Sequence, residues 1–235
     1  MIGSAAGLGV NAPKEATLFV IAVFMPAIGA IPTGMRLLAS QDNMVRAWPG
    51  GFGYAKVGAN YGPSLMANSE ARARGYDQIL WLLGKEALVT EAGASNFFVI
   101  WRTKEGKVQL VTAPLGDKII LDGVTRRSIL QLAKERLVDG KSGLEAIEIV
   151  ERKFTMEDIV EATEEGRMIE AFAAGTAYFV SPVSVINFRD KDYNIPMARG
   201  ESGEYAAVIK QWLVNIMYGK EDHEFGVVIE ERSEL

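Results

Sequence analysis

Residues 47–65 read AWPGGFGYAKVGANYGPSL, a glycine-rich segment with one lysine, Lys56, near its middle. Its glycines and prolines predict a loop, and Pro63 is placed to occupy the first turn of a helix that stops at Gly75. The segment lacks the GxGxxG spacing and the directly following helix of a dinucleotide-binding loop. By composition alone Lys56 is interpreted as a solvated surface residue, because lysine is rarely buried.

Strand and helix patterns alternate on the C-terminal side of this loop. Three strand patterns separated by turn signals predict an antiparallel run, and helices and strands then alternate to the last helix. Thr155 and Asp158 have the spacing of a capping box at a helix start, and Gly166 marks the stop of that helix. Strands are predicted over 78–83, 96–102, 107–113, 146–150 and within 169–188, and helices over 63–74, 124–137, 155–166 and 205–218. The predicted fold is therefore mixed α/β, or α+β.

The N-terminal part has a different character. Residues 17–24, TLFVIAVF, are β-branched and aromatic and predict a buried strand. Residues 25–36, MPAIGAIPTGMR, hold two prolines and two glycines, which favours a connector. We expect three units, namely residues 1–25, a connector over 26–36, and a large domain over 37–235.

The composition excludes several classes of protein. A net charge of -5 with 23% charged residues gives no basic surface for a nucleic acid. The absence of cysteine and the single histidine, His223, exclude disulfides, thiolate zinc sites and cysteine nucleophiles, so no metal site is expected. Neither GxSxG nor GxxxxGK[ST] occurs, which argues against a serine hydrolase or a P-loop enzyme.

The chain shows no sign of a membrane segment or of a secretory signal. Its start has no basic region followed by an apolar core, and the apolar run over 18–31 is too short, and too broken by Pro26, to span a bilayer. We expect a soluble protein with no membrane partner and a cytoplasmic location, with mitochondria not excluded.

The segment 47–65, followed by ARARGYDQILWL, resembles the segment of fold-type IV branched-chain aminotransferases whose lysine binds pyridoxal 5′-phosphate. The similarity continues in the family's order through VTEAGASNFFV, LVTAPLGDKIILDGVTRRSIL, VERKFTMEDIVEATEEGR, EAFAAGTAYFVSPV and IMYGKEDHEF. It implies the mixed α/β fold of the large cofactor-binding domain of the D-amino acid aminotransferase-like enzymes. The similarity begins in what would be the last strand of the family's small N-terminal domain, so the resemblance implies that residues 1–25 are a remnant of that domain.

The resemblance also implies roles for three side chains. Lys56 would form the aldimine with the cofactor and then, once released, carry the proton between the substrate Cα and the cofactor. Glu91 would face the pyridine nitrogen and keep it protonated, the alternative being a surface glutamate between strands. Tyr61 would donate a hydrogen bond to the phenolic oxygen of the cofactor, the alternative being a core tyrosine.

Two turns are expected to bind anions. By resemblance, Val124 and Thr125 would hold the cofactor phosphate where a loop enters the helix over 124–137, since a helix N-terminus favours anions. Thr176 and Ala177 would form a second turn that faces both the phosphate and the substrate carboxylate. Arg126 is interpreted either as a ligand or as a salt bridge that holds the helix.

The sequence departs from the family pattern at three alanines, all on expected substrate or cofactor contacts. Ala94 stands where the family usually has threonine, Ala173 where it commonly has glycine, and Ala30 where many relatives have tyrosine. The family's small domain also contributes an arginine to the phosphate and aromatic residues to the substrate pocket. Without that domain we expect a site more open to water, which weakens electrostatic interactions with a bound ligand.

The resemblance implies an aminotransferase that moves the amino group of a branched-chain or other apolar amino acid to 2-oxoglutarate, as a homodimer. An alternative is a different pyridoxal-phosphate-dependent reaction in a specialised biosynthetic pathway, because racemisation, elimination and decarboxylation share the same carbanion. The contrasting alternative is a non-catalytic domain that acts as an interaction protein.

Overall fold

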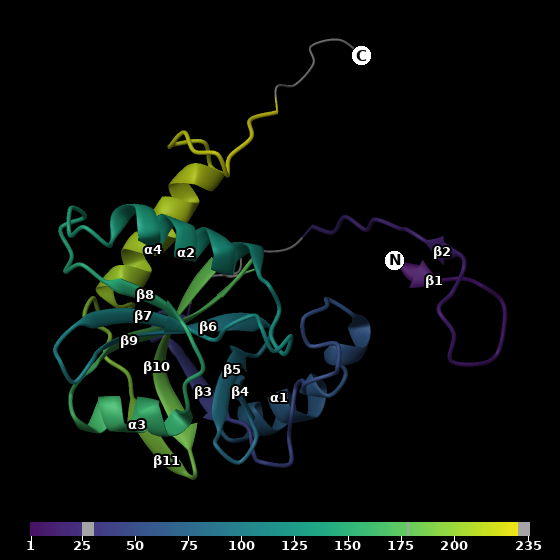
Figure 1. Ribbon diagram of the computed structural model, residues 1–235, viewed down its shortest axis with the longest axis horizontal. Coiled ribbons are helices and arrows are strands. Elements are labelled where there is room, and N and C mark those ends of the chain that lie inside the picture. Colours follow the sequence, from purple (N-terminus) through teal and green to yellow (C-terminus); the bar gives the residue numbers. More distant parts are fainter. Residues whose placement is uncertain (25–30, 178, 230–235) are drawn as a thin grey trace.

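A nine-stranded mixed sheet forms the centre of the protein (Figure 1). The computed structural model describes residues 1–24, 31–177 and 179–229. The strands of this sheet are β3 (Met35–Ala39), β4 (Gln78–Leu83), β5 (Leu88–Ala92), β6 (Ser95–Arg102), β7 (Val108–Thr112), β8 (Glu148–Glu151), β9 (Met168–Gly175), β10 (Phe179–Phe188) and β11 (Lys191–Asn194).

Six of these strands close into a barrel. Going round it, β10 pairs with β3, β3 with β4, β4 with β5, β5 with β6, β6 with β9, and β9 again with β10. The two pairs that involve β3 are parallel and the other four are antiparallel. The remaining strands β7, β8 and β11 extend the sheet beyond the ring.

The barrel strands are apolar on both faces because both faces are covered. On β4, Leu80 and Leu82 point into the barrel core, whereas Trp81 lies in an outer cluster with helix α1 (Ser64–Ala73). On β6, Phe97 and Val99 pack in the barrel while their neighbours pack outside it. Successive side chains of a strand alternate between its faces, so the uninterrupted apolar runs of the sequence reflect two buried faces.

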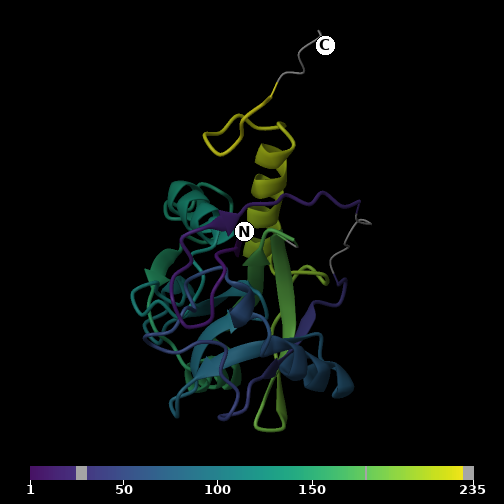
Figure 2. The same ribbon diagram turned by 90° about the vertical axis from the view of Figure 1, so that its right-hand side faces the viewer.

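The helices cover the outside of the barrel and one of its ends. Helix α2 (Val124–Arg136) and helix α4 (Glu204–Met217) pack side by side on β9 and β10 (Figures 1 and 2). Helix α3 (Met156–Glu164) brings Ile159 and Ala162 into the barrel core and closes one end. The predicted capping box at the start of α3 is confirmed, since Thr155 and Asp158 exchange hydrogen bonds of 2.8 and 3.1 Å. The end opposite α3 holds the cavity described below.

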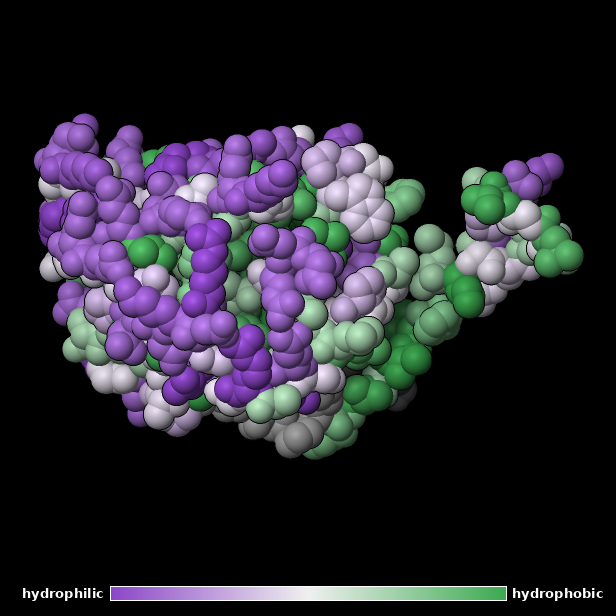
Figure 3. All heavy atoms as spheres, turned by 90° about the horizontal axis from the view of Figure 1, so that it is seen from below, coloured by the Kyte–Doolittle hydropathy of each residue, from purple (hydrophilic) through white to green (hydrophobic). Residues whose placement is uncertain are grey.

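The predicted buried strand over 17–24 is wrong. The first 24 residues are exposed and form a separate arm, with a two-residue ladder between β1 (Ile2–Gly3) and β2 (Ala16–Thr17) (Figures 1 and 3). Composition favours a strand over 18–24, but burial requires neighbouring strands or a packed helix, and the described residues supply neither. Ala30 and positions 26–30 of the expected connector lie outside the described residues. No helix in the described ranges is long and apolar enough to cross a lipid bilayer.

Candidate functional site

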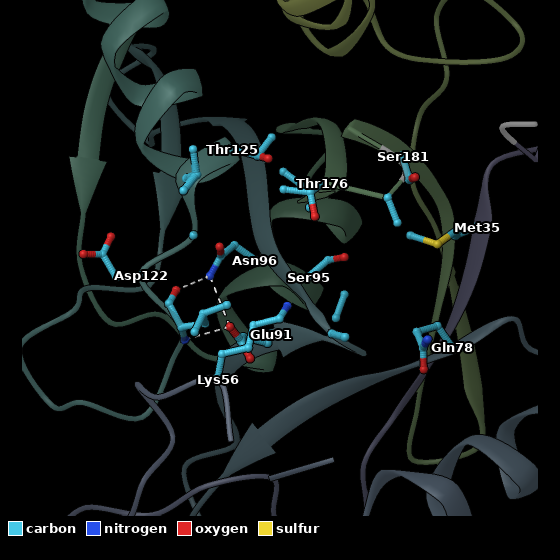
Figure 4. Close-up of a pocket in the computed structure, with 18 residues that line it drawn as sticks. Met35, Lys56, Gln78, Glu91, Ser95, Asn96, Asp122, Thr125, Thr176 and Ser181 are labelled. Carbon is cyan, nitrogen blue, oxygen red and sulfur yellow. Dashed lines mark hydrogen bonds between the residues drawn. The ribbon is translucent and has the colours of Figure 1, made fainter. Parts of the chain in front are cut away.

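A cavity of about 510 Å³ lies at the open end of the barrel. Its walls come from the starts of β3, β4, β6 and β10, the ends of β5 and β9, and the loop before α2. Six of the seven residues predicted for the site line it, and Figure 4 shows their side chains around one space. They are Lys56, Glu91, Val124, Thr125, Thr176 and Ala177.

Tyr61 is the exception among the predicted residues. It is half-buried and does not line the cavity, and its ring centre lies 5.7 Å from the Nζ of Lys56. The structure therefore brings the tyrosine next to the lysine but not into the cavity wall. A direct contact between Tyr61 and a bound cofactor stays a prediction.

Glu91 is held at the end of β5 by a tight hairpin. Gly93, with a φ of 57°, takes the first of two turn positions between the paired residues Ala92 and Ser95, as in a type II′ turn. Glu91 is 1% exposed, so the alternative of a surface glutamate is wrong. Its Oε1 accepts hydrogen bonds from the Leu121 backbone N–H at 2.9 Å and from the Asn96 side chain at 3.2 Å.

The other oxygen of Glu91 is paired but not saturated. Arg46 Nε lies 2.6 Å from Oε2, and both side chains are almost fully buried. Apart from this ion pair with Arg46, Oε2 accepts no hydrogen bond from any described residue. Burial raises the pKa of Glu91 to about 7, against the lowering effects of Arg46, of the Leu121 amide and of Lys56. The cavity thus contains a buried carboxyl group with a free acceptor position.

The loop that carries Lys56 is fixed at two points. Asn60 donates from Nδ2 to the carbonyls of Phe52 and Ala55, both at 2.7 Å. Gly53 packs so closely that an added Cβ would lie 2.6 Å from the carbonyl oxygen of Ile119. Lys56 itself is exposed and lines the cavity beside Glu91 (Figure 4). The lysine amine is therefore accessible on a loop whose backbone is anchored.

The N-terminus of α2 faces the same cavity. Gly123 is its N-cap and provides no side-chain cap, so the first amides of the helix are free for an anion. A Cβ at Gly123 would collide with the Oδ1 of Asn96, so any side chain at this position would require Asn96 to move. Val124 is exposed and Thr125 is 8% exposed, and both line the cavity. The start of this helix can therefore accept an anion, and anion binding here stays a prediction.

The second predicted turn, between β9 and β10, lies beside this helix start, and Figure 4 shows Thr176 next to Thr125. Thr176 and Ala177 are exposed, and both line the cavity from this side. The neighbouring Arg126 does not line it, because its guanidinium donates to Glu151 at 2.6 Å and to the Ala113 carbonyl at 2.9 Å. Of the two interpretations of Arg126, the structure shows the salt bridge that holds the helix.

The two described departures from the family pattern differ in position. Ala94 lines the cavity, in the turn next to Gly93, and so has direct access to a ligand. Ala173 is buried on β9 within the barrel core. Only the first of these substitutions changes the chemistry of the cavity wall.

Two residues of the site are missing from the sequence-based prediction. Asn96 is 3% exposed and joins Glu91 to the Leu121 carbonyl, to which it donates at 2.8 Å. Arg46 is 6% exposed and joins the glutamate to the lysine loop. The signal for Asn96 is an amide inside a strand pattern, where asparagine is depleted. Arg46 has no such local signal, because arginine is mostly exposed.

Comparisons with known proteins identify relatives of this chain. A family model described as amino-transferase class IV matches residues 3–186. The chain is 44% identical over 222 residues to the mitochondrial branched-chain-amino-acid aminotransferase of Schizosaccharomyces pombe. This match covers 94% of this chain and 50% of that relative. It is also 44% identical over 227 residues to the cytosolic branched-chain-amino-acid aminotransferase of Saccharomyces cerevisiae. This second match covers 95% of this chain and 58% of that relative.

A solved structure is similar as well. It is the branched-chain aminotransferase of the thermophilic archaeon Thermoproteus uzoniensis with norvaline, with a TM-score of 0.62 and 27% identity. The match covers 82% of this chain and 54% of that one. The chain spans about half the length of the curated relatives it matches.

Proposed function

The chain belongs to the amino-transferase class IV family, among the branched-chain aminotransferases, and from this membership we propose that it transfers the amino group of a branched-chain or other apolar amino acid to 2-oxoglutarate. The norvaline of the Thermoproteus uzoniensis structure is an apolar amino acid, which supports this substrate class. The proposed cofactor is pyridoxal 5′-phosphate. One observation carries the proposal: an accessible lysine, a buried carboxyl group and the two turns that are predicted to bind anions line a single cavity.

The residues present fit this cofactor. Oε2 of Glu91 is a buried acceptor without an aligned donor, which a protonated pyridine nitrogen would supply. The uncapped N-terminus of α2, together with the Thr125 and Thr176 residues, suits a phosphate group. Lys56 provides the amine that an aldehyde requires. Lys56, Glu91, Val124, Thr125 and Thr176 would therefore hold the cofactor.

Each residue then has a distinct task. The cofactor, when bound, supplies an electron-accepting ring that stabilises negative charge at the substrate Cα. Glu91 keeps a proton on the ring nitrogen, which requires the carboxyl group to be ionised. The Nζ of Lys56 would serve as the base and acid that accepts and delivers the proton at the substrate Cα. Thr176 and Ala177 orient the substrate by its carboxylate, so that the Cα proton faces the lysine.

The test begins with cofactor attachment. Purified protein is incubated with pyridoxal 5′-phosphate, reduced with borohydride and analysed by peptide mass spectrometry, with Lys56→Ala and an exposed-lysine control, Lys107→Ala. We expect modification at Lys56 in the wild type and in the control, and none at this site in Lys56→Ala. Failure of Lys56 to react contradicts both this proposal and any other pyridoxal-phosphate-dependent reaction, and leaves the interaction-protein alternative.

Turnover separates the enzymatic alternatives. Incubation with leucine and 2-oxoglutarate should yield glutamate, and the Glu91→Gln variant should lose most of this activity because its side chain carries no negative charge. Attachment at Lys56 without glutamate, but with racemised, decarboxylated or eliminated product from an amino acid, would instead support the second reaction class.

Assembly, domains and location complete the proposal. We propose a homodimer, supported by the exposed apolar side chains Leu18, Val20 and Ile21 on the arm (Figure 3), and sedimentation as a monomer would contradict it. We propose that residues 1–25 belong to a small N-terminal domain, 26–36 to a connector and 37–235 to the large domain, so limited proteolysis should remove the arm and spare the rest. A cytoplasmic or mitochondrial location is proposed from the names of the two relatives.

A further inference from the structure

We propose that Arg46 is a positioning residue that favours the ionised form of Glu91 and ties the Lys56 loop to it. The inference deepens the proposed function and rests on it where the cofactor is concerned. Arg46 does not line the cavity, so any effect it has on a ligand passes through other residues. Its side chain is nonetheless almost fully buried directly behind the glutamate.

The guanidinium contacts three separate segments. Nε lies 2.6 Å from the Glu91 carboxylate at the end of β5. One terminal nitrogen donates to the carbonyl of Ile119 at 3.0 Å, in the loop that leads to α2. Both terminal nitrogens also lie within 3.3 to 3.4 Å of the Gly53 carbonyl, three residues before Lys56. One side chain therefore links the segments that carry the amine, the carboxylate and the phosphate-facing helix start.

The charge of Arg46 is the main influence that opposes the effect of burial on the pKa of Glu91. Burial raises the pKa of Glu91, and among the groups that lower it Arg46 comes first, followed by the Leu121 amide and Lys56. Asn96 also faces the carboxylate, as a neutral donor. Asp122 lines the cavity, but it pairs with Arg127 at 2.6 Å and its side chain points away from Glu91 (Figure 4). Without Arg46, the buried glutamate would be left protonated at neutral pH.

The Arg46→Lys substitution would preserve the positive charge but would lose the contacts that join the three segments. The planar guanidinium reaches a carboxylate and two carbonyls in different directions, whereas an ammonium is a compact point charge on a flexible stem. Arg46→Lys and Arg46→Met therefore separate the two parts of the proposal. Arg127→Met is the matched control, because Arg127 also pairs with an acid near α2 but is exposed.

The first measurement follows the protonation of Glu91 in the absence of any cofactor. Carbon-13 NMR of glutamate side chains follows the carboxyl group of Glu91, assigned by its loss in Glu91→Gln. The wild type and Arg127→Met should titrate alike. Arg46→Met should titrate about one to three pH units higher, the usual effect of an opposite charge at this distance, and Arg46→Lys within about one pH unit of the wild type. An unchanged midpoint in Arg46→Met, or an Arg46→Lys midpoint as high as that of Arg46→Met, would overturn the role in ionisation.

The second measurement follows the stability of the loop that carries Lys56. Amide hydrogen exchange over residues 47–60 should be at least about tenfold faster in both Arg46 variants, since a lost hydrogen bond of about 1.4 kcal/mol corresponds to a factor of ten. If Arg46→Met does not fold, Arg46→Lys still tests this part, and unchanged exchange in it would refute the positional role.

The third measurement joins the inference to the proposed function. Fluorescence titration with pyridoxamine 5′-phosphate, which has no aldehyde to react with Lys56, gives an affinity at each pH. We expect both Arg46 variants to bind at least about tenfold more weakly than the wild type at pH 7.5. If the wild-type protein does not bind the compound, the proposed function is contradicted, whereas the NMR result on Arg46 is unaffected. Equal binding in all variants would refute the effect of Arg46 on the ligand.

Discussion

Glu170 allows a sharp test of how burial competes with hydrogen bonding. It lies on β9 at 2% exposure, and its carboxylate accepts hydrogen bonds from the backbone amides of Tyr205 at 3.1 Å and Ala206 at 2.6 Å, at the start of α4. The N-cap is Gly203, where a Cβ would collide with this carboxylate. Two amide donors lower the pKa of a carboxyl group, and burial raises it. Burial prevails here, and the pKa of Glu170 rises to about 7.

The size of the effect follows from the two pKa values. The unfolded chain binds this proton with the ordinary value of 4.5 and the folded protein with about 7. At 1.36 kcal/mol for each pH unit, the difference amounts to about 3 kcal/mol. Because the folded pKa is the higher one, this stabilisation is fully present below pH 4.5 and is lost as the pH rises through 7. A loss of this size is a large fraction of the stability of an ordinary domain.

The assay compares the wild type with Glu170→Gln by urea unfolding between pH 4.5 and 8. Glutamine does not titrate, and every other group, including Glu91, is common to both proteins. The free energy of unfolding of the wild type minus that of the variant should therefore fall by about 3 kcal/mol across this range. A difference that stays constant, or that rises with pH, would show that the amide donors outweigh burial, and the reasoning would be refuted.

Three further predictions concern the fold and the cavity. Leu80→Ala, which removes a fully buried barrel side chain, should lower the free energy of unfolding by about 2–5 kcal/mol, whereas the exposed Leu65→Ala should change it by less than about 0.5 kcal/mol in the same urea experiment. Thr155→Ala should cost about 1 kcal/mol by loss of the capping box, and an unchanged midpoint would contradict this. Gly123→Ala should weaken the binding of inorganic phosphate at least about tenfold in calorimetry, because its Cβ would push Asn96 aside; equal affinity would show that this cradle binds no anion.

Local signals predict the helices and most of the strands. The periodicity over 124–137 and the capping box at Thr155 place α2 and α3 to within a residue or two. Strand β5 is not predicted, because its sequence LVTEA contains Glu91, and a buried acid contradicts the strand pattern. The rule that strands are depleted in acidic residues fails at Glu91, the residue proposed to contact the cofactor. Such a failure is expected where function opposes stability. The closure of the ring through β9 involves contacts between distant segments, which no local pattern encodes.

The site is predicted by resemblance rather than by chemistry. Composition alone makes Lys56 a surface residue, and the structure agrees that it is exposed, so its exposure does not distinguish it from other lysines. What distinguishes it is the loop around it, anchored by Asn60, Gly53 and Arg46. Arg46 contacts Glu91 and the Ile119 carbonyl only because three segments converge, and that convergence is a property of the tertiary fold.

Ring closure also imposes an order of events on the newly made chain. Met35, at the start of β3, accepts a hydrogen bond from Ser184 on β10, which follows 149 positions later. Until β10 has left the ribosome, β3 has a neighbour on one side only, and its free edge is open to pairing with other chains. Such distant pairing slows folding, so we expect this protein to depend on chaperones during synthesis more than a helical protein of the same length.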